Sequence, residues 1–140
     1  AKLDKLPCLR LNGTSDIQWE HQEYKGKTVF EMFPQIQFYD YTKIPTRKVK
    51  GITNYHLTWS YSEANEKYSK MFDTIPYNKA VVFRNLLPSL FKNVKVIDGD
   101  EHDMRFLDEP NVVVGLKAKG KAIKDYSGFV IDNLVEARAV

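Results

Sequence analysis

The chain contains six short apolar stretches of strand length, separated by polar segments. They cover residues 9–11, 36–43, 54–60, 79–84, 94–97 and 112–116. Strands that are apolar on both faces are typical of a parallel sheet covered by other elements, and VVVGL at 112–116 has that pattern. We therefore predict a single α/β domain over residues 1–140, with a mainly parallel sheet of about six strands joined by short helical connections. A partial barrel is the alternative arrangement of the same strands.

Short helices are expected between the strands. An apolar face at 29–33 ends at Pro34, and residues 62–72 begin with a serine cap and early glutamates that suit a helix dipole. We also expect a short helical connection at 86–93. After Gly128 the pattern predicts a last strand, with a helical end to the chain as one option.

Polar side chains follow each predicted strand. They are found at residues 12–16, 40–43, 58–60, 84–85, 98–103 and 117–121. Because the carboxyl ends of parallel strands meet at one edge of a sheet, and ligand sites of α/β proteins lie there, we expect one polar rim. The alternative is that these residues are polar only because loops are solvated.

The charge and the cysteine content indicate which partners and which redox compartment suit the protein. The 140 residues carry a net charge of +3, which permits an anionic partner without requiring one. Cys8 is the single cysteine, so the chain forms no internal disulfide, and this fits a reducing compartment. No apolar run approaches the ~18 residues of a membrane span, and AKLDKLP at the start lacks the apolar region of a signal peptide. We expect no membrane partner.

The acidic group after residue 97 is the strongest candidate for chemistry. Asp98, Asp100 and Asp103, with His102 beside them, are the candidate catalytic residues, and Asp98 and Asp100 are the candidate ligands of Mg²⁺ or Mn²⁺. A close carboxylate pair also separates its pKa values into an acid and a base. The alternative is that these acids cap a turn and pair with Arg105 or nearby lysines.

The lysine row after residue 116 is the candidate phosphate site. In a strand, the spacing of Lys117, Lys119 and Lys121 places three ammonium groups on one face. Lysines at this spacing also protect an exposed strand edge from pairing, which is the alternative reading. The segment does not fit the spacing of a phosphate-binding P-loop.

Further candidate ligand-binding residues lie at other strand ends. They are Asn12, Ser15, Asp16, Lys43 and His56. NGTSD at 12–16 can cradle an anion through its backbone amides, or its side chains can simply cap a following helix. His56 is also explained as a packed, hydrogen-bonded strand residue. The basic side chains Arg47, Lys48 and Lys50 are expected to form a solvated surface.

Several longer strings occur together in this chain. They are RLNGTSD from Arg10, FPQIQFYDYTK from Phe33, NYHLTWSYSEAN from Asn54, VIDGDEHDMRFLD from Val96 and VGLKAKGKA from Val114. Together they resemble a family of tailed-bacteriophage and prophage proteins. The resemblance implies a phage origin and a host-cytoplasm setting, and it identifies no catalytic residue. Longer members carry a cysteine-containing segment upstream, which implies that this chain is the C-terminal part of a larger barrel-like protein.

Two hypotheses of different classes follow. The first is an enzyme or enzyme remnant that binds a phosphate-bearing ligand, a nucleotide or nucleic acid, with metal assistance. The second is a non-catalytic phage protein that binds a host protein or nucleic acid during host takeover. The sequence does not decide whether the protein is an enzyme.

Overall fold

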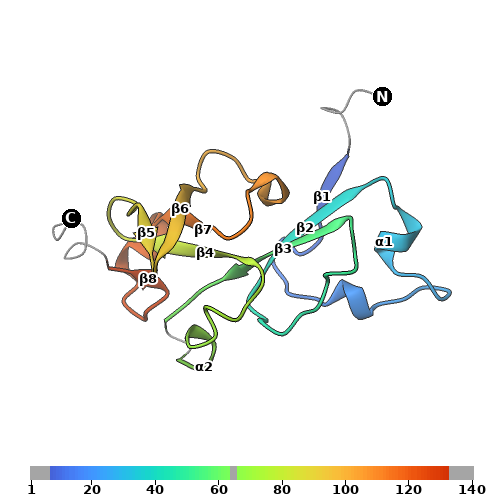
Figure 1. The fold of residues 1–140 in the computed structure, drawn as a ribbon, viewed down its shortest axis with the longest axis horizontal. Helices are drawn as coiled ribbons and strands as arrows, with labels where there is room; N and C mark the ends of the chain where they lie inside the picture. The colour runs from blue at the N-terminus through green and yellow to red at the C-terminus, as the bar shows by residue number, and fades with distance from the viewer. Residues whose placement is uncertain (1–6, 64–65, 133–140) are drawn as a thin grey trace.

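One twisted sheet organises the molecule (Figure 1). The computed structural model describes residues 7–63 and 66–132. Eight strands lie in the order β1-β2-β3-β4-β7-β6-β5, and β8 pairs with β4 beside this path. Their bounds are β1 Cys8–Arg10, β2 Gln37–Thr42, β3 Tyr55–Ser60, β4 Asn78–Phe83, β5 Leu90–Phe91, β6 Val94–Asp98, β7 Val113–Lys117 and β8 Val130–Ile131. Every pair is parallel except β5 with β6, so the expected mainly parallel α/β sheet is confirmed, with eight strands instead of six.

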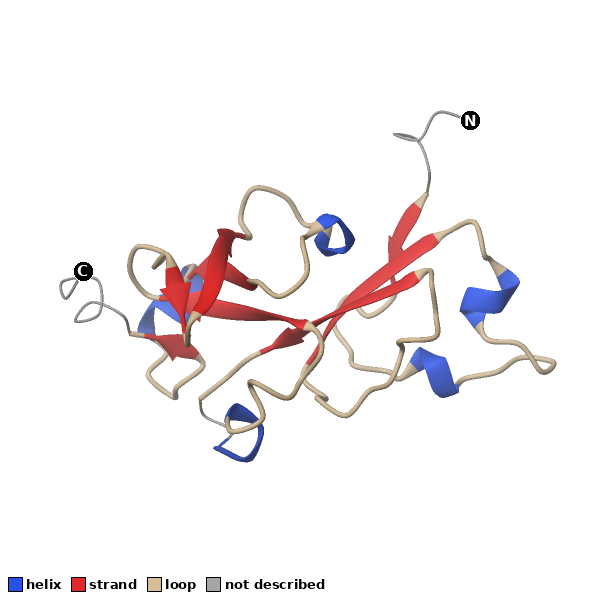
Figure 2. Cartoon of the chain, viewed as in Figure 1, coloured by secondary structure: helices blue, strands red, loops and turns tan. Residues whose placement is uncertain are grey.

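Helices are fewer and shorter than expected (Figure 2). They are α1 (Val29–Met32), α2 (Glu66–Ser69) and the 3₁₀ turns η2 (Trp19–His21), η3 (Arg105–Leu107) and η4 (Gly120–Lys124). A capping box between Thr28 and Glu31 starts α1 as predicted. Among the described residues, no helix has the length and apolar character needed to cross a membrane. The helical end proposed for the chain lies outside the described residues.

One expected helical segment is only partly helical, and another was predicted wrongly. Among the described residues of 62–72, α2 is the α-helical part, and the Ser69 hydroxyl there donates to Glu66 O at 3.0 Å and competes with the helical ladder. Residues 86–93 form β5 and a hairpin turn. Lys92 and Asn93 have φ values of +49° and +65°, and a two-residue turn with positive φ matches the twist of paired strands.

The register between β3 and β4 offsets the ends of these two strands, and we call this offset the step. Thr42 at the end of β2 lies opposite Trp59, and Ser60 at the end of β3 lies opposite Ala80. Strand β4 continues three residues beyond that point, to Phe83, which lies opposite Lys117 of β7. The carboxyl ends of the parallel strands therefore lie on the same side of the sheet, and β4 and β7 extend three residues past the end of β3.

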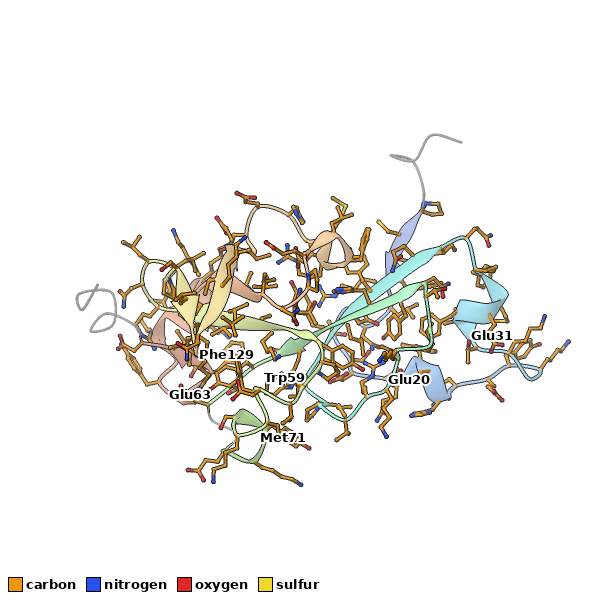
Figure 3. All side chains as sticks on the ribbon, viewed as in Figure 1. Glu20, Glu31, Trp59, Glu63, Met71 and Phe129 are labelled. Atoms are coloured by element: carbon orange, nitrogen blue, oxygen red, sulfur yellow. The ribbon has the colours of Figure 1, made fainter. Side chains whose placement is uncertain are left out.

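Two apolar cores lie on either side of the step. The larger core contains Trp59, Tyr61, Phe72, Ile75, Val81, Phe83, Phe91, Val113 and Ile131. The smaller core contains Phe30, Phe38, Val49, Tyr55 and Leu57. Trp59 lies near the middle of the molecule and is 1% exposed (Figure 3). Edge-to-face aromatic pairs such as Tyr61 with Phe72, at 5.4 Å, fill the larger core in place of helices.

The segment 99–108 leads from β6 to η3, which packs near β3. Arg105 is 1% exposed and pairs with Asp108 at 3.3 Å. Gly99 lies directly against this pair: a Cβ at Gly99 would come within 2.4 Å of Val114 Cγ1 and 2.7 Å of Arg105 Nη1. The close approach explains why glycine occupies this position, since a larger residue would displace both side chains.

We expect Gly99→Ala to destabilise the fold by about 1–3 kcal/mol, because the added methyl group overpacks this site. Gly51→Ala is the matched control, since a Cβ at Gly51 would meet nothing within 4 Å. Urea denaturation of the two variants measures the difference. Equal stability of the two variants would show that the segment does not pack as closely as the structure indicates.

Candidate functional site

A cavity of about 330 Å³ opens at the carboxyl ends of β1, β2 and β3. We call it the β1–β3 cavity. It is lined by Arg10, Asn12, Gly13, Thr14, Ser15, Asp16, Tyr41, Thr42, Lys43 and Ser60. Four of the candidate ligand-binding residues are thus brought together: Asn12, Ser15, Asp16 and Lys43. The position agrees with the general location of ligand sites in parallel sheets.

Asn12 shapes the loop that forms one wall of the cavity. It is 2% exposed, and its Oδ1 accepts hydrogen bonds from Ser15 Oγ at 3.0 Å and Trp19 Nε1 at 2.9 Å. Its Nδ2 donates to Ile17 O at 2.9 Å. These bonds leave little of the side chain for a ligand, so Asn12 holds the loop in shape while Ser15 stays exposed.

Asp16 fastens the same loop to the end of β2. Its carboxylate accepts from Thr42 Oγ1 at 2.8 Å, from Lys43 N at 2.7 Å and from Arg47 Nη1 at 3.2 Å. The loop does not lead into a capped helix, because η2 has no side-chain cap. The capping alternative for residues 12–16 is therefore wrong, and long-range bonds to β2 and Arg47 use the Asp16 carboxylate instead.

A buried charge network lies beneath the cavity. Arg47 is 2% exposed and donates to both carboxylate oxygens of Glu20, at 2.6 and 2.9 Å. It also donates to Tyr55 OH at 2.9 Å, and this hydroxyl donates to Asp40 Oδ2 at 2.6 Å. The expected solvated surface was wrong for Arg47 and right for Lys48 and Lys50, which are exposed. All of these partners are distant in the sequence.

Burial and pairing set the proton affinities of this network. Burial raises the pKa of Asp40 despite hydrogen bonds from Tyr55 and the Asn12 amide. Burial also raises the pKa of Tyr55, and the neighbouring Asp40 raises it further. For Glu20 the effect of burial is outweighed by the hydrogen bonds from Arg47, so its pKa is lowered. Glu20 and Arg47 therefore form an ion pair at neutral pH.

The groups of the cavity left for a ligand are mainly positive or hydrogen-bond donors. The Arg10 guanidinium lies 5.0 Å from the Tyr41 ring, and its only ion pair with a described residue is a partly exposed contact with Asp103 at 3.8 Å. Lys43 is exposed. Within the described chain, the backbone N–H groups of residues 13–16 donate no hydrogen bond. Consecutive free amides beside two cations favour an anion.

The acidic candidates have separate partners instead of a common centre. Asp98 Oδ1 accepts from the Asp100 amide at 2.9 Å, and Asp103 pairs with Arg10. His102 is exposed, and its Nδ1 accepts from Met104 N at 3.2 Å. No group of three His, Cys, Asp or Glu side chains in the described ranges is placed to hold a metal ion. The expected Mg²⁺ or Mn²⁺ site at Asp98 and Asp100 stays a prediction.

The acidic segment and the lysine row do meet at one edge of the sheet. Asp100 accepts from the Lys117 amide at 3.0 Å and from Lys119 Nζ at 2.9 Å. Burial would raise the pKa of Asp100, but these hydrogen bonds outweigh it and lower the pKa. Lys121 is exposed. The expected row of three lysines on one strand face is wrong, because β7 ends at Lys117, Lys119 precedes η4 and Lys121 lies within η4. Since β7 also lies between β4 and β6, the edge-protection alternative does not apply.

His56 does not line the β1–β3 cavity. It lines a second cavity of about 330 Å³ together with Asp108 and Asn78. Burial lowers the pKa of His56 and keeps the imidazole neutral at pH 7. Its Nδ1 and the Thr58 hydroxyl are buried without a hydrogen-bond partner in the part of the chain that is described.

Arg10, Tyr41 and Ser60 line the β1–β3 cavity but were missed as site residues. Each lies at the carboxyl end of a predicted strand, so the position along the strand was the available signal. Arg10 lies two residues before Asn12, and its charge close to the loop at 12–16 is what the sequence interpretation overlooked.

We expect Tyr55→Phe to destabilise the protein by about 1–3 kcal/mol at pH 7, because it leaves the buried Asp40 carboxylate short of a donor. Without that donor the pKa of Asp40 rises further, so the destabilisation is largest above this pKa and shrinks as the pH falls through it. Chemical denaturation from pH 4 to pH 7 measures this trend. Tyr39→Phe is the control, and a pH-independent effect would contradict the role of Asp40.

Comparison with known proteins gives one result. A family model described as Gene product 88 matches residues 1–133. No curated protein and no solved structure matches the chain. The family agrees with the expected phage origin and supplies no activity. Since the match covers nearly the whole chain, the protein belongs to the Gene product 88 family.

Proposed function

We propose that this phage protein binds a phosphate-bearing ligand, a nucleotide or a segment of nucleic acid, in the β1–β3 cavity. The observation that carries the proposal is the meeting of Arg10, Lys43 and the free amides of residues 13–16 at the carboxyl ends of three parallel strands. Anionic oxygens accept several hydrogen bonds at once, and backbone amides with a guanidinium group provide them.

The charge balance of the cavity supports an anion. Its described lining contains two cations, Arg10 and Lys43, and one acid, Asp16. The Asp16 carboxylate shares the buried Arg47 with Glu20, so Asp16 keeps part of its negative charge, and the lining as a whole remains positive by one charge. The volume of about 330 Å³ lies at the lower end of the range for small-molecule sites, which suits the phosphate and sugar of one nucleotide.

Metal assistance is the less supported part of the proposal. Asp98 and Asp100 are both exposed and lie at the end of β6, where hydrated Mg²⁺ binds through one or two carboxylates in many phosphate sites. Asp100 already accepts two hydrogen bonds, including one from Lys119. A metal ion would have to compete with that lysine.

A non-catalytic role in binding a host protein is the second candidate. The observation that favours it is a set of large exposed apolar side chains after β4 and around β5 and η4: Leu86, Leu90, Ile123 and Tyr126, which are 72%, 57%, 52% and 77% exposed. Exposed apolar patches mark interaction surfaces. The host cytoplasm is the expected setting under both candidates.

Lys43→Gln and Arg10→Gln should each weaken binding of pyrophosphate and of ATP about tenfold to a hundredfold, because each removes a charge-assisted hydrogen bond. Isothermal titration calorimetry at low salt measures the affinities. Lys48→Gln is the matched control, since Lys48 is exposed and does not line the cavity. If the wild-type protein binds neither probe, or if all three variants bind equally, the proposed function is wrong.

For the metal, we expect Mg²⁺ or Mn²⁺ to raise the melting temperature of the wild-type protein, by mass action on the folded state. The rise should be lost in Asp98→Asn and Asp100→Asn. Asp73→Asn is the control, because Asp73 is exposed and distant in sequence from this segment. A melting temperature that does not respond to either ion removes metal assistance and leaves the ligand proposal in place.

A further inference from the structure

The surface formed by residues 117–126 has a composition different from the rest of the rim. It contains η4 and the residues around it, and we call it the η4 surface. Lys117, Lys119, Lys121 and Lys124 are exposed there, and Asp125 is the one acid within these ten residues. Lys121 and Lys124 make no ion pair with any residue that the structure describes. The surface therefore carries a local positive charge, which the described residues reduce at Lys119 through its ion pair with Asp100.

The same surface carries an exposed aromatic side chain, Tyr126, two residues after Lys124. Tyr126 is 77% exposed, and the Arg84 guanidinium lies 4.1 Å from the centre of its ring. An exposed tyrosine ordinarily moves between rotamers, whereas the guanidinium here supports one face of the ring by a cation–π contact. The solvent-exposed side of the ring is then available to a flat partner.

The support beneath the ring is built into the fold. Arg84 follows β4 directly, its side chain is 13% exposed, and its amide donates to Ile131 O of β8 at 2.9 Å. Its guanidinium donates to the carbonyl oxygens of Ile123 and Asp125, which both lie just before Tyr126 in the chain. The guanidinium therefore has a fixed position before any ligand arrives.

The single acid of the η4 surface is occupied by its own turn. Asp125 Oδ1 accepts from the Ser127 amide at 2.8 Å and from the Ser127 hydroxyl. These hydrogen bonds lower the pKa of Asp125, so it remains an anion that caps the turn. It orders the chain next to Tyr126, and Lys121 and Lys124 have no ion pair among the described residues.

We propose that the η4 surface binds single-stranded nucleic acid, with one base stacked on Tyr126 and the adjacent phosphates near Lys121 and Lys124. A supported aromatic ring surrounded by lysines is the arrangement by which proteins bind single strands without sequence preference. In a duplex the bases are already stacked and paired, so they are not available to stack on Tyr126, and a duplex should bind more weakly. The inference does not depend on the β1–β3 cavity, although both surfaces lie on the same side of the sheet.

Fluorescence anisotropy with labelled dT₂₀ and rU₂₀ tests the proposal and separates DNA from RNA. The full chain should bind at least one of them more tightly than a 20-base-pair duplex, with log affinity falling with log salt at a slope of about −2 for about three phosphate contacts. Tyr126→Ala should weaken binding about fivefold to a hundredfold, and Tyr126→Phe should keep it within about twofold, because the ring is retained.

Tyr24→Ala is the matched control. Tyr24 is 65% exposed and lies 5.4 Å from Lys25 Nζ, so it is also an exposed tyrosine beside a cation. Tyr126→Ala should leave pyrophosphate binding unchanged, because Tyr126 does not line the β1–β3 cavity, so a failure of this proposal can be told apart from a failure of the proposed function. The proposal is overturned if the wild-type protein binds neither oligonucleotide at low salt, if the duplex binds as tightly as the single strands, or if Tyr126→Ala binds like Tyr24→Ala.

Discussion

The buried guanidinium of Arg47 is the constraint on which the first half of the structure depends. A charge enclosed in protein is costly unless each of its donors is satisfied. Here Glu20, Asp16 and Tyr55 satisfy the donors, and the Tyr77 hydroxyl donates to the Arg47 carbonyl oxygen. These partners come from four separate segments of the chain. Arg47 thus fixes the loop at 12–16, η2 and the start of β3 relative to each other, in a region that contains little helix.

The strands could be predicted from the sequence because their signal is local. The alternation in 36–43 and the apolar run in 112–116 need no knowledge of the rest of the chain. The register of the strands and the burial of polar groups have no such local signal. The offset that places Ser60 opposite Ala80 is set by packing between residues that are far apart in the sequence. The burial of Arg47 is set in the same way, although its segment, PTRKVKG, has the composition of a solvated surface. The extent of the short helices was predicted poorly for a related reason. Side chains such as Ser69 compete with the helical hydrogen bonds only in a given backbone geometry, which the sequence does not show.

The candidate site also divides into features that the sequence predicts and features that depend on contacts between distant residues. The rule that carboxyl ends of parallel strands share an edge brought Asn12, Ser15, Asp16 and Lys43 together in one cavity. The acidic group was treated as a unit because its members are close in sequence, but the chain between Asp98 and Asp108 turns away from the sheet edge. Asp100 then pairs with Lys119, and Asp103 pairs with Arg10. Proximity along a loop says little about proximity in space, whereas the ends of paired strands are held together by the sheet.

The step in the sheet has a consequence for what the rim can bind. Strand β4 extends three residues past the level of Ser60, and at ~3.3 Å per residue the two levels differ by about 10 Å. A single phosphate in the β1–β3 cavity therefore cannot also reach the η4 surface. Lys43 nevertheless lies 6.0 Å from the ring of Phe129, three residues beyond Tyr126, so the two surfaces are adjacent along the rim. A ligand that uses both must be a polymer with repeated phosphates, because only its length can cover the step.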